Sequence, residues 1–411
     1  MGLLADAFRE AVAKNPKMQE ANFDVLYPTG FLSFDFLNGY VVTVRDEEDH
    51  VSKYNAIGLV DGSSTTIIGR SGCGKTTFAL QVAANIVRPF KNGVIFYDDI
   101  ESGSNAARRQ TLTGFTPDEM TERIIYRNSA ISAENFYERI SIIYDTKLKN
   151  PKDYMYDTGK YDPRGNRIYK MVPTVYILDS LAMLTPENIT EEEKLSGSMS
   201  SSAIAKSNTS VYKRIIPKLK AANIMLLVIN HITDKIEINA FSHTKGKVRG
   251  LKQGESLPGG NAAIYLANNM IRMDDTTRLK DTEGLGINGT IVDLSIIKSR
   301  TNENLTSVPL VFDVKTGFDP DLSLYAYLKE KEILPKGAYM TLPGSDIKFT
   351  AKNFKELLYT NQEFQKQFSD VCIKELSKLL SDGEQSMQKE TEETTSLASS
   401  MVGLATQTIS M

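Results

Sequence analysis

The stretch that decides the fold runs from residue 65 to residue 87 and reads TTIIGRSGCGKTTFALQVAANIV. Its middle, GRSGCGKT at 69–76, fits the pattern G-x-x-x-x-G-K-[ST] without a mismatch. The apolar TTII before the pattern predicts a β-strand and the residues after it predict a helix, which is the setting that this pattern requires. Glycines let backbone N–H groups turn toward phosphates, and a helix N-terminus favours negative charge. The sequence therefore predicts a loop that binds the phosphates of a nucleotide.

Within this loop, Lys75 is expected to meet the β- and γ-phosphates, and the Thr76 hydroxyl to coordinate Mg²⁺. The residues expected to contact ATP here are Gly69, Arg70, Ser71, Gly72, Cys73, Gly74, Lys75, Thr76 and Thr77. We interpret Cys73 as a small filler of the loop rather than a redox switch. The only other cysteine is Cys372, and two cysteines without a disulfide framework indicate a reducing cytosol.

Two acidic strand ends complete the expected hydrolytic site. VYILD at 175–179 is an apolar strand ending in Asp179, which we expect to hold Mg²⁺, usually through water. FYDDIE at 96–101 places Asp98, Asp99 and Glu101 at the end of another strand. A hydrolytic ATPase needs a carboxylate that polarises the attacking water. The spacing alone leaves open which of the three acids is this base.

Outward from the loop, apolar runs alternate with helical stretches, which predicts βαβ units and a mainly parallel sheet. The expected strands are 65–68, 93–97, 174–178, 224–229, 270–273, 291–297 and 308–312, and the expected helices lie near 75–88, 131–148, 204–221 and 322–333. The polar, tyrosine-rich stretch 149–171 is predicted to be an inserted surface hairpin. A smaller module with helical periodicity in 352–380 follows the core.

Composition and charge set the outer bounds. The chain has 411 residues, 41% of them hydrophobic and 24% charged, which is ordinary globular usage. The longest apolar run, IMLLVI at 224–229, is far shorter than the ~20 residues of a membrane helix, and no signal peptide is visible. The apolar stripe in 1–25 predicts a short helix, and the polar tail 382–411 is predicted to be disordered and mildly acidic.

Positive charge is concentrated in one region. Between residues 206 and 252 there are ten Lys or Arg against two acids, although the net charge of the chain is −3. Within it, FSHTKGKVRGLKQG at 241–254 has four cations, three glycines and no acid, which is typical of a loop that orders on phosphates. Phe241 can stack on bases. These features predict contacts to nucleic acid.

Taken together, these segments resemble the RecA/RadA recombinase family, and within it the UvsX type of bacteriophages. The resemblance covers roughly residues 26–335 and rests on segments whose order and spacing match: PTGFLSFDFLNG (28–39), the phosphate loop, FYDDIESG (96–103), YILDSLAMLTP (176–186), LLVINH (226–231), LPGGNA (257–262) and IIKSRT (296–301). It implies an α/β fold, a RecA-like phosphate-loop ATPase core with a mainly parallel central sheet. The implied organisation is an N-terminal oligomerisation helix and tether (1–40), the core (41–335), a small C-terminal module (336–381) and the tail.

The resemblance also implies roles for single residues. Glu101 matches the catalytic glutamate, with Asp99 as a competitor because this chain inserts one residue into the usual Asp-x-Glu. Arg108 falls where the family stacks a flat side chain on adenine, and His231 matches the residue that senses the γ-phosphate. Lys298 and Arg300 match two cations that reach the ATP of the neighbouring subunit. The DNA loops fall near 190–203 and 232–258, and their implied DNA-binding residues are Met199, Lys206, Phe241, Lys245, Lys247, Arg249, Lys252, Gly259 and Gly260.

The activity that the resemblance implies is that of a DNA-dependent ATPase with ATP and Mg²⁺ as cofactors. Such a protein forms helical filaments on single-stranded DNA and catalyses pairing and strand exchange with homologous double-stranded DNA in recombination and repair. The implied setting is the host cytosol or a phage replication compartment, without membrane contact, with single-strand-binding and loader proteins as further partners. Two alternatives stay open: a recombinase-like mediator or scaffold without strand exchange, and a replicative helicase built on the same core.

Overall fold

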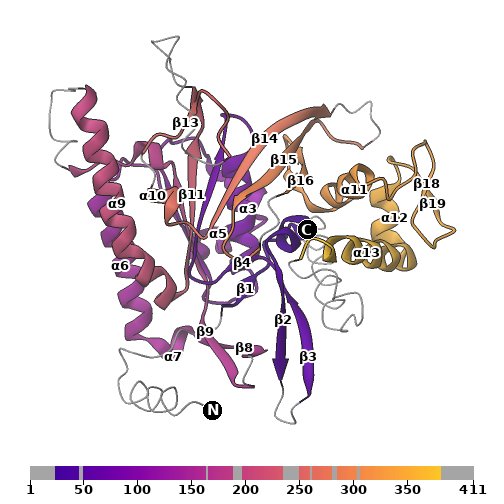
Figure 1. Ribbon diagram of the computed structural model, residues 1–411, viewed down its shortest axis with the longest axis horizontal. Helices are drawn as coiled ribbons and strands as arrows, with labels where there is room; N and C mark the ends of the chain where they lie inside the picture. Colours follow the sequence, from indigo (N-terminus) through magenta and orange to yellow (C-terminus); the bar gives the residue numbers. More distant parts are fainter. Residues whose placement is uncertain are drawn as a thin grey trace.

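A nine-stranded sheet forms the centre of the computed structural model (Figure 1). The structure describes residues 24–45, 50–162, 165–187, 197–234, 250–259, 262–279, 285–302 and 306–380. In spatial order its strands are β17 (Gly317–Asp319), β16 (Ser307–Asp313), β15 (Gly289–Lys298), β14 (Asn269–Leu279), β5 (Ser64–Gly69), β11 (Ile224–His231), β10 (Thr174–Asp179), β6 (Val94–Asp99) and β7 (Ile124–Arg127). The six strands from β14 to β7 run parallel, and β15, β16 and β17 continue the sheet antiparallel. The predicted α/β class with a mainly parallel sheet is confirmed.

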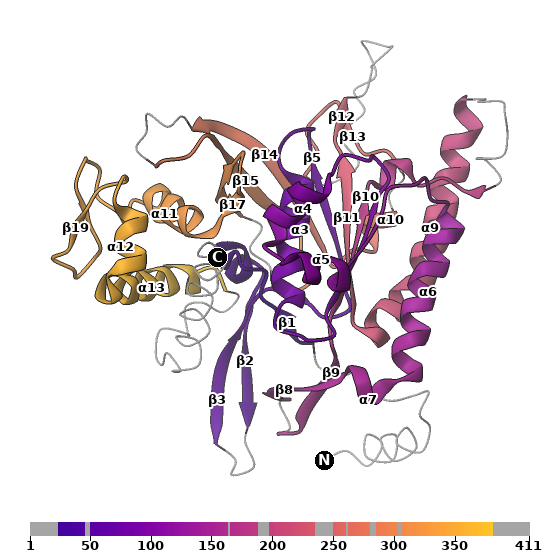
Figure 2. The same cartoon turned by 180° about the vertical axis from the view of Figure 1, so that it is seen from behind.

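Helices cover both faces of this sheet, as the two opposite views show (Figures 1 and 2). One face carries α3 (Lys75–Val87), α4 (Ala106–Thr113) and α5 (Pro117–Arg123), and the other carries α6 (Ala133–Lys149) and α9 (Gly197–Ala222). Strand β10 shows why: Val175 and Ile177 join the core beneath α3, whereas Tyr176 and Leu178 join the core beneath α6 and α9. Side chains alternate across a strand, so a strand that is apolar at every position is buried on both faces.

All the strands and helices predicted for the core are present. Helix α9 begins at Gly197, earlier than predicted, so that the last residues of the expected 190–203 loop belong to a helix. The edge strand β7 was not predicted, because it has four residues and is half exposed. None of the helices in the described ranges is long and apolar enough to cross a membrane.

The segment at 28–39 is bonded to helix α3. The backbone N–H of Thr29 donates to both carboxylate oxygens of Asp35, at 2.9 and 3.0 Å, and its hydroxyl donates at 2.6 Å. Asn85 of α3 donates to the carbonyl of Thr29 at 2.9 Å. Gly30 has a φ of +88°, and a Cβ there would lie 2.1 Å from the Asn85 side chain. Residues 28–39, which include α2 (Leu32–Leu37), are therefore packed into the core and do not form a free tether.

The C-terminal module also joins the main core. It follows α11 (Pro320–Glu330) and consists of β18 (Met340–Thr341), β19 (Lys348–Phe349), α12 (Phe354–Thr360) and α13 (Gln362–Ser377), which confirms the helical periodicity seen in 352–380. Phe354 contacts Phe349, Phe364 and Phe368 at ring-centroid distances from 5.1 to 6.2 Å. Because these rings belong to the same hydrophobic cluster as α2 and α3, the module and the central sheet share one continuous core.

Two hairpins leave the lower edge of the molecule in Figure 1, β2 (Tyr40–Arg45) with β3 (Val51–Ala56), and β8 (Met155–Tyr161) with β9 (Arg167–Met171). The second, which follows α7 (Pro151–Tyr154), is the hairpin predicted for 149–171. It is not confined to the surface, because Lys170 is buried and pairs with buried Asp61 at 2.8 Å. Asp61 also accepts from Val25 N–H at 2.9 Å and from Lys220 at 3.1 Å. The hairpin thus anchors β1 (Leu26–Tyr27), which pairs with β4 (Leu59–Val60).

Replacing Lys170 by alanine is expected to lower the free energy of unfolding by about 3 kcal/mol, because it removes one partner of a buried ion pair. Chemical denaturation monitored by circular dichroism measures the loss. Lys336→Ala is the matched control, because Lys336 forms an ion pair with Glu332 in which both side chains are largely exposed. Equal stability of the two variants would show that the Lys170–Asp61 pair does not hold the hairpin.

Candidate nucleotide-binding site

The predicted phosphate loop connects β5 to α3. Gly72 and Gly74 both have a φ of +84°, a conformation that favours glycine, and a Cβ at Gly74 would lie 2.8 Å from the Phe318 ring. Lys75 is the first residue of α3 and is 5% exposed. Its ammonium donates to the carbonyls of Gly69 at 3.0 Å and Arg70 at 2.7 Å, so it lies over the loop. Burial lowers the pKa of Lys75, which the nearby carboxylates oppose.

Asp179 and Thr76 meet beside this loop. Asp179 ends β10, and its carboxylate accepts from the Thr76 hydroxyl at 2.6 Å and from Tyr97 at 3.4 Å. A hydroxyl and a carboxylate are hard oxygen ligands of the kind that Mg²⁺ prefers, completed in nucleotide sites by phosphates and water. In the part of the chain that the structure describes, no group of three or more His, Cys, Asp or Glu could hold a metal alone. The pair fits the expected Mg²⁺ position of a nucleotide complex.

Burial raises the pKa of Asp179 to about 6, and the Thr76 hydrogen bond opposes this rise. Because only the ionised carboxylate attracts Mg²⁺ strongly, we expect Mg²⁺-dependent binding of ATPγS to weaken by about tenfold for each pH unit below 6. Titrations at pH 5 and pH 7.5 measure the change. Asp179→Asn is the control, since protonation of the nucleotide itself affects both proteins equally. Equal pH dependence of the two proteins would contradict the role of Asp179.

The three acids near the end of β6 have different surroundings. Asp98 faces α6 and pairs with Arg139 at 2.5 Å. Asp99 is buried and accepts from the backbone N–H groups of Gly103 and Ser104 at 3.1 and 3.0 Å. These contacts hold Asp98 and Asp99 within the protein and shape the turn that carries Glu101.

Glu101 is the acid that lies beside the phosphate-loop strands. The Ser180 hydroxyl donates to its Oε1 at 2.6 Å, and Nε2 of His231 lies 3.0 Å from Oε1 and 3.2 Å from Oε2. His231 ends β11, the strand between β5 and β10. The ends of neighbouring parallel strands therefore bring together Glu101, His231 and the residue that follows Asp179. Ser180 was not predicted as a site residue, although its place after Asp179 was a signal.

The backbone near residue 259 is held by two buried asparagines. Asn230 accepts from the N–H of His231 at 2.9 Å and donates to the carbonyl of Pro258 at 2.8 Å. Asn208 of α9 donates to the carbonyl of Gly259 at 2.9 Å. The sequence carries no local signal for either contact, because helix, strand and loop are far apart along the chain.

Arg108 lies at the other side of the phosphate-loop helix. Its guanidinium donates to the carbonyl of Lys315, at 2.5 Å, in the turn between β16 and β17. The side chain of Thr77 is buried against Gly317, where a Cβ would lie 3.0 Å from it. The methyl group of Thr77 therefore packs against Gly317, and the start of α3, α4 and the β16–β17 turn lie together around Arg108.

Two loop side chains turn away from the predicted ligand. Arg70 forms a bidentate ion pair with Asp234, at 3.0 and 2.7 Å. Cys73 is buried and donates to the carbonyl of Arg70 at 3.0 Å, and burial raises the pKa of its thiol. Arg70 can serve a phosphate through its backbone in this arrangement, and the burial of Cys73 favours the filler interpretation.

Lys298 and Arg300 lie away from this site. Strand pairing sets Met273 opposite Gly69 and Met270 opposite Lys298, at the end of the sheet where the parallel strands begin. Three residues of strand, about 10 Å, separate these levels. Lys298 donates to the carbonyl of Tyr265 in α10 (Ala262–Tyr265) at 2.7 Å, and Arg300 donates to the same carbonyl at 3.3 Å. The structure therefore does not bring the two cations to the phosphate loop of the same chain.

The predicted DNA-binding residues are only partly described. Lys206 on α9 and Lys252 are exposed. The carbonyl of Gly259 accepts a hydrogen bond from Asn208. Met199 lies in the first turns of α9. The remaining residues, Phe241, Lys245, Lys247, Arg249 and Gly260, lie outside the described residues.

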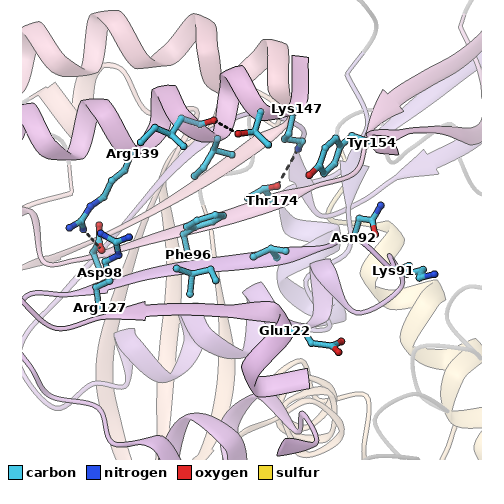
Figure 3. Close-up of a pocket in the computed structure, with 15 residues that line it drawn as sticks. Lys91, Asn92, Phe96, Asp98, Glu122, Arg127, Arg139, Lys147, Tyr154 and Thr174 are labelled. Carbon is cyan, nitrogen blue, oxygen red and sulfur yellow. Dashed lines mark hydrogen bonds and ion pairs between the residues drawn. The ribbon is translucent and has the colours of Figure 1, made fainter. Parts of the chain in front are cut away.

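A cavity of about 370 Å³ lies on the opposite face of the sheet, between α6 and the strands β6 and β7 (Figure 3). Phe96, Asp98, Arg139 and Lys147 line it, and Arg139 points to Asp98. Lys147 is buried, which lowers its pKa to about 7, and donates to the carbonyl of Val172 at 2.6 Å. Because side chains alternate along β6, Asp98 faces this cavity and Asp99 does not, so the cavity is separate from the nucleotide-binding candidate.

No family model and no curated protein matches the chain. Its functional assignment therefore depends on the site geometry and on the resemblance of its motifs.

Proposed function

We propose that the chain is a DNA-dependent ATPase with a RecA-like phosphate-loop core, which assembles on single-stranded DNA and catalyses homologous pairing and strand exchange. The observation that carries the proposal is the convergence of Lys75, Thr76, Asp179, Glu101 and His231 at one edge of the parallel sheet. In open α/β sheets, ligands bind at the edge where the strands end. The basic region between 206 and 252 and the order of the motifs support DNA as the partner.

The chemistry would be divided among these residues. Thr76 and Asp179 would hold Mg²⁺, which when bound supplies positive charge at the phosphate oxygens. Lys75 neutralises charge that develops on the β- and γ-phosphates. Glu101 orients a water molecule and accepts its proton, while Ser180 and His231 hold the two oxygens of its carboxylate. His231, at the start of the expected second DNA loop, would sense the γ-phosphate.

Lys298 and Arg300 would act in the neighbouring subunit. A single chain has Lys75 as the cation over its phosphate loop, and the other two lie at the opposite end of the sheet. When subunits stack head to tail, that end faces the nucleotide of the next subunit. Two cations supplied there would stabilise the γ-phosphate charge as arginine fingers do. ATP would thus favour the filament, and hydrolysis would release it.

The two alternative functions differ from the proposed one in their site or in their assembly. An inert mediator or scaffold does not need Glu101 placed between Ser180 and His231, a hydrogen-bonded arrangement that suits hydrolysis. A replicative helicase on the same core would form closed rings. Electron microscopy with single-stranded DNA and ATP is expected to show extended helical filaments, and rings or isolated particles would contradict the proposal.

Alanine at both Lys298 and Arg300 is expected to leave the subunit folded and able to bind ATP, but to suppress DNA-stimulated ATPase activity by roughly 10³-fold. Mixing this variant with Lys75→Ala tests the direction of the contact. The first supplies an intact phosphate loop and the second supplies intact cations, so mixed filaments should regain part of the lost turnover. No recovery in filaments shown to contain both proteins would count against a shared site.

A further inference from the structure

The turn that carries Glu101 is held by buried groups behind it. Asp99 is 1% exposed and accepts from the backbone N–H groups of Gly103 and Ser104, so the turn closes on its own first residue. Inside the turn, Ser102 has a φ of +53°, a conformation that residues with a side chain adopt only where their surroundings hold it. The contacts around Asp99 therefore fix the direction in which the turn presents Glu101.

A tyrosine from the neighbouring strand completes these contacts. Tyr126 belongs to β7, and its hydroxyl lies 3.1 Å from Oδ2 of Asp99 and 3.2 Å from the carbonyl oxygen of Ser104. Its one hydrogen can be donated to either acceptor. Burial and the Asp99 carboxylate raise the pKa of Tyr126, so the hydroxyl keeps this hydrogen at neutral pH. Tyr126 thus contacts both ends of the turn.

An arginine from α4 holds the same group of atoms. The buried Arg109 guanidinium donates to the carbonyl of Ser104 at 2.7 Å, and its central carbon lies 3.5 Å from the centre of the Tyr126 ring. Cations are attracted to the face of an aromatic ring, more strongly where water is excluded. Because β7 and β10 flank β6 on opposite sides, Tyr126 and Arg109 support the turn from the side opposite to Ser180.

We propose that Tyr126 and Arg109 are positioning residues for ATP hydrolysis, which hold the turn so that Glu101 faces the attacking water, an inference that rests on the proposed function. Ser180 and His231 hold the carboxylate of Glu101, whereas Tyr126 and Arg109 hold the backbone that carries it. A catalytic group misplaced by about 1 Å can slow a reaction by about a hundredfold. The side-chain hydrogen bonds of both residues go to the turn, so their loss is expected to slow hydrolysis and to leave ATP affinity unchanged.

The first test replaces Tyr126 by phenylalanine in the full chain, which removes only the hydroxyl and keeps the ring beside Arg109. DNA-stimulated turnover is expected to fall about tenfold, with KM for ATP within about twofold of the unsubstituted value. Tyr359→Phe is the matched control, because Tyr359 of α12 also donates to a buried carboxylate, that of Asp321, at 2.7 Å. The control is expected to lower stability and to leave the turnover of the folded protein unchanged.

The second test separates positioning from a merely structural role. Tyr126→Phe is combined with Glu101→Gln, and single-turnover rapid quench measures the hydrolysis step. A residue that acts through Glu101 has no further effect once the carboxylate is gone, so the double variant should hydrolyse ATP at the rate of Glu101→Gln alone. Arg109→Lys, which keeps the charge but loses the planar group on the Tyr126 ring, is expected to behave as Tyr126→Phe does. It replaces Tyr126→Phe in both tests if that variant does not fold.

The outcomes separate this role from the proposed function. Turnover of Tyr126→Phe within about twofold of the unsubstituted chain overturns the positioning role and leaves the proposed function standing. An equal loss with and without the Glu101 carboxylate does the same. Absence of ATP hydrolysis by the unsubstituted chain overturns the proposed function, and the positioning role with it. A loss at unchanged KM that appears only while Glu101 is present supports the positioning role.

Discussion

Replacing Lys75 by alanine is expected to abolish ATP hydrolysis, with a loss of at least about 10³-fold in turnover. The Lys75 ammonium lies over the phosphate loop, bonded to two loop carbonyls, and no other cation of the described residues of this chain donates to those carbonyls. Without it, the proposed site would have only Mg²⁺ and the neighbouring subunit to neutralise charge on the γ-phosphate. Steady-state phosphate release in the presence of single-stranded DNA measures the effect.

Lys147→Ala is the control for this variant, because Lys147 is also buried and also donates to a backbone carbonyl. It lies on the opposite face of the sheet, beside the α6 cavity. We expect it to lower stability and to leave the turnover of the folded protein unchanged. Turnover of Lys75→Ala at the level of the unsubstituted chain would remove the phosphate loop from the reaction.

Glu101→Gln is expected to reduce turnover by about 10² to 10⁴-fold while nucleotide and DNA still bind. Glutamine keeps the size of the side chain and can still accept from Ser180, but it cannot take a proton from water. The expected result is a stalled complex, with ATPγS affinity near that of the unsubstituted chain. Rapid-quench measurement of the hydrolysis step separates this from a binding defect.

Asp99→Asn distinguishes the two candidate bases. Asp99 accepts from Gly103, Ser104 and Tyr126, so its replacement should loosen the turn and cost stability more than chemistry. If Asp99→Asn stops hydrolysis in a folded protein and Glu101→Gln does not, the inserted residue has shifted the base to Asp99.

Much of the fold could be predicted because its central strands are short apolar runs. Strands β5, β10 and β11 are buried on both faces, and helix α3 follows directly from the phosphate-loop pattern. Strand β7 and the β2–β3 hairpin were missed for the opposite reason, since half-exposed strands lack a continuous apolar signal. The packing of α2 against α3 is a tertiary contact that periodicity does not contain.

Only the part of the candidate site that is local in sequence could be predicted. The phosphate loop is local in sequence, so its glycines and Lys75 were predicted from their spacing. Contacts between distant segments were not: the Arg70–Asp234 pair joins residues 164 positions apart, and the Ser180–Glu101 bond joins residues 79 apart. Choosing the candidate base among Asp98, Asp99 and Glu101 required knowing where each side chain points. Inserting one residue into a strand turns the following side chains to the other face, so spacing alone could not decide.

If subunits assemble head to tail as proposed, the placement of Lys298 and Arg300 at the far end of the sheet from the phosphate loop makes the two tips of the filament different. In an open head-to-tail row, every junction completes one site, so a row always has one fewer working site than it has members. The subunit at one tip lacks a donor of cations and would therefore retain its ATP, while the subunit at the other tip has a complete site but no neighbour to receive its own cations. The two tips would then hydrolyse ATP at different rates. Disassembly of the filament would proceed from one tip, and the fold of the single chain would determine which.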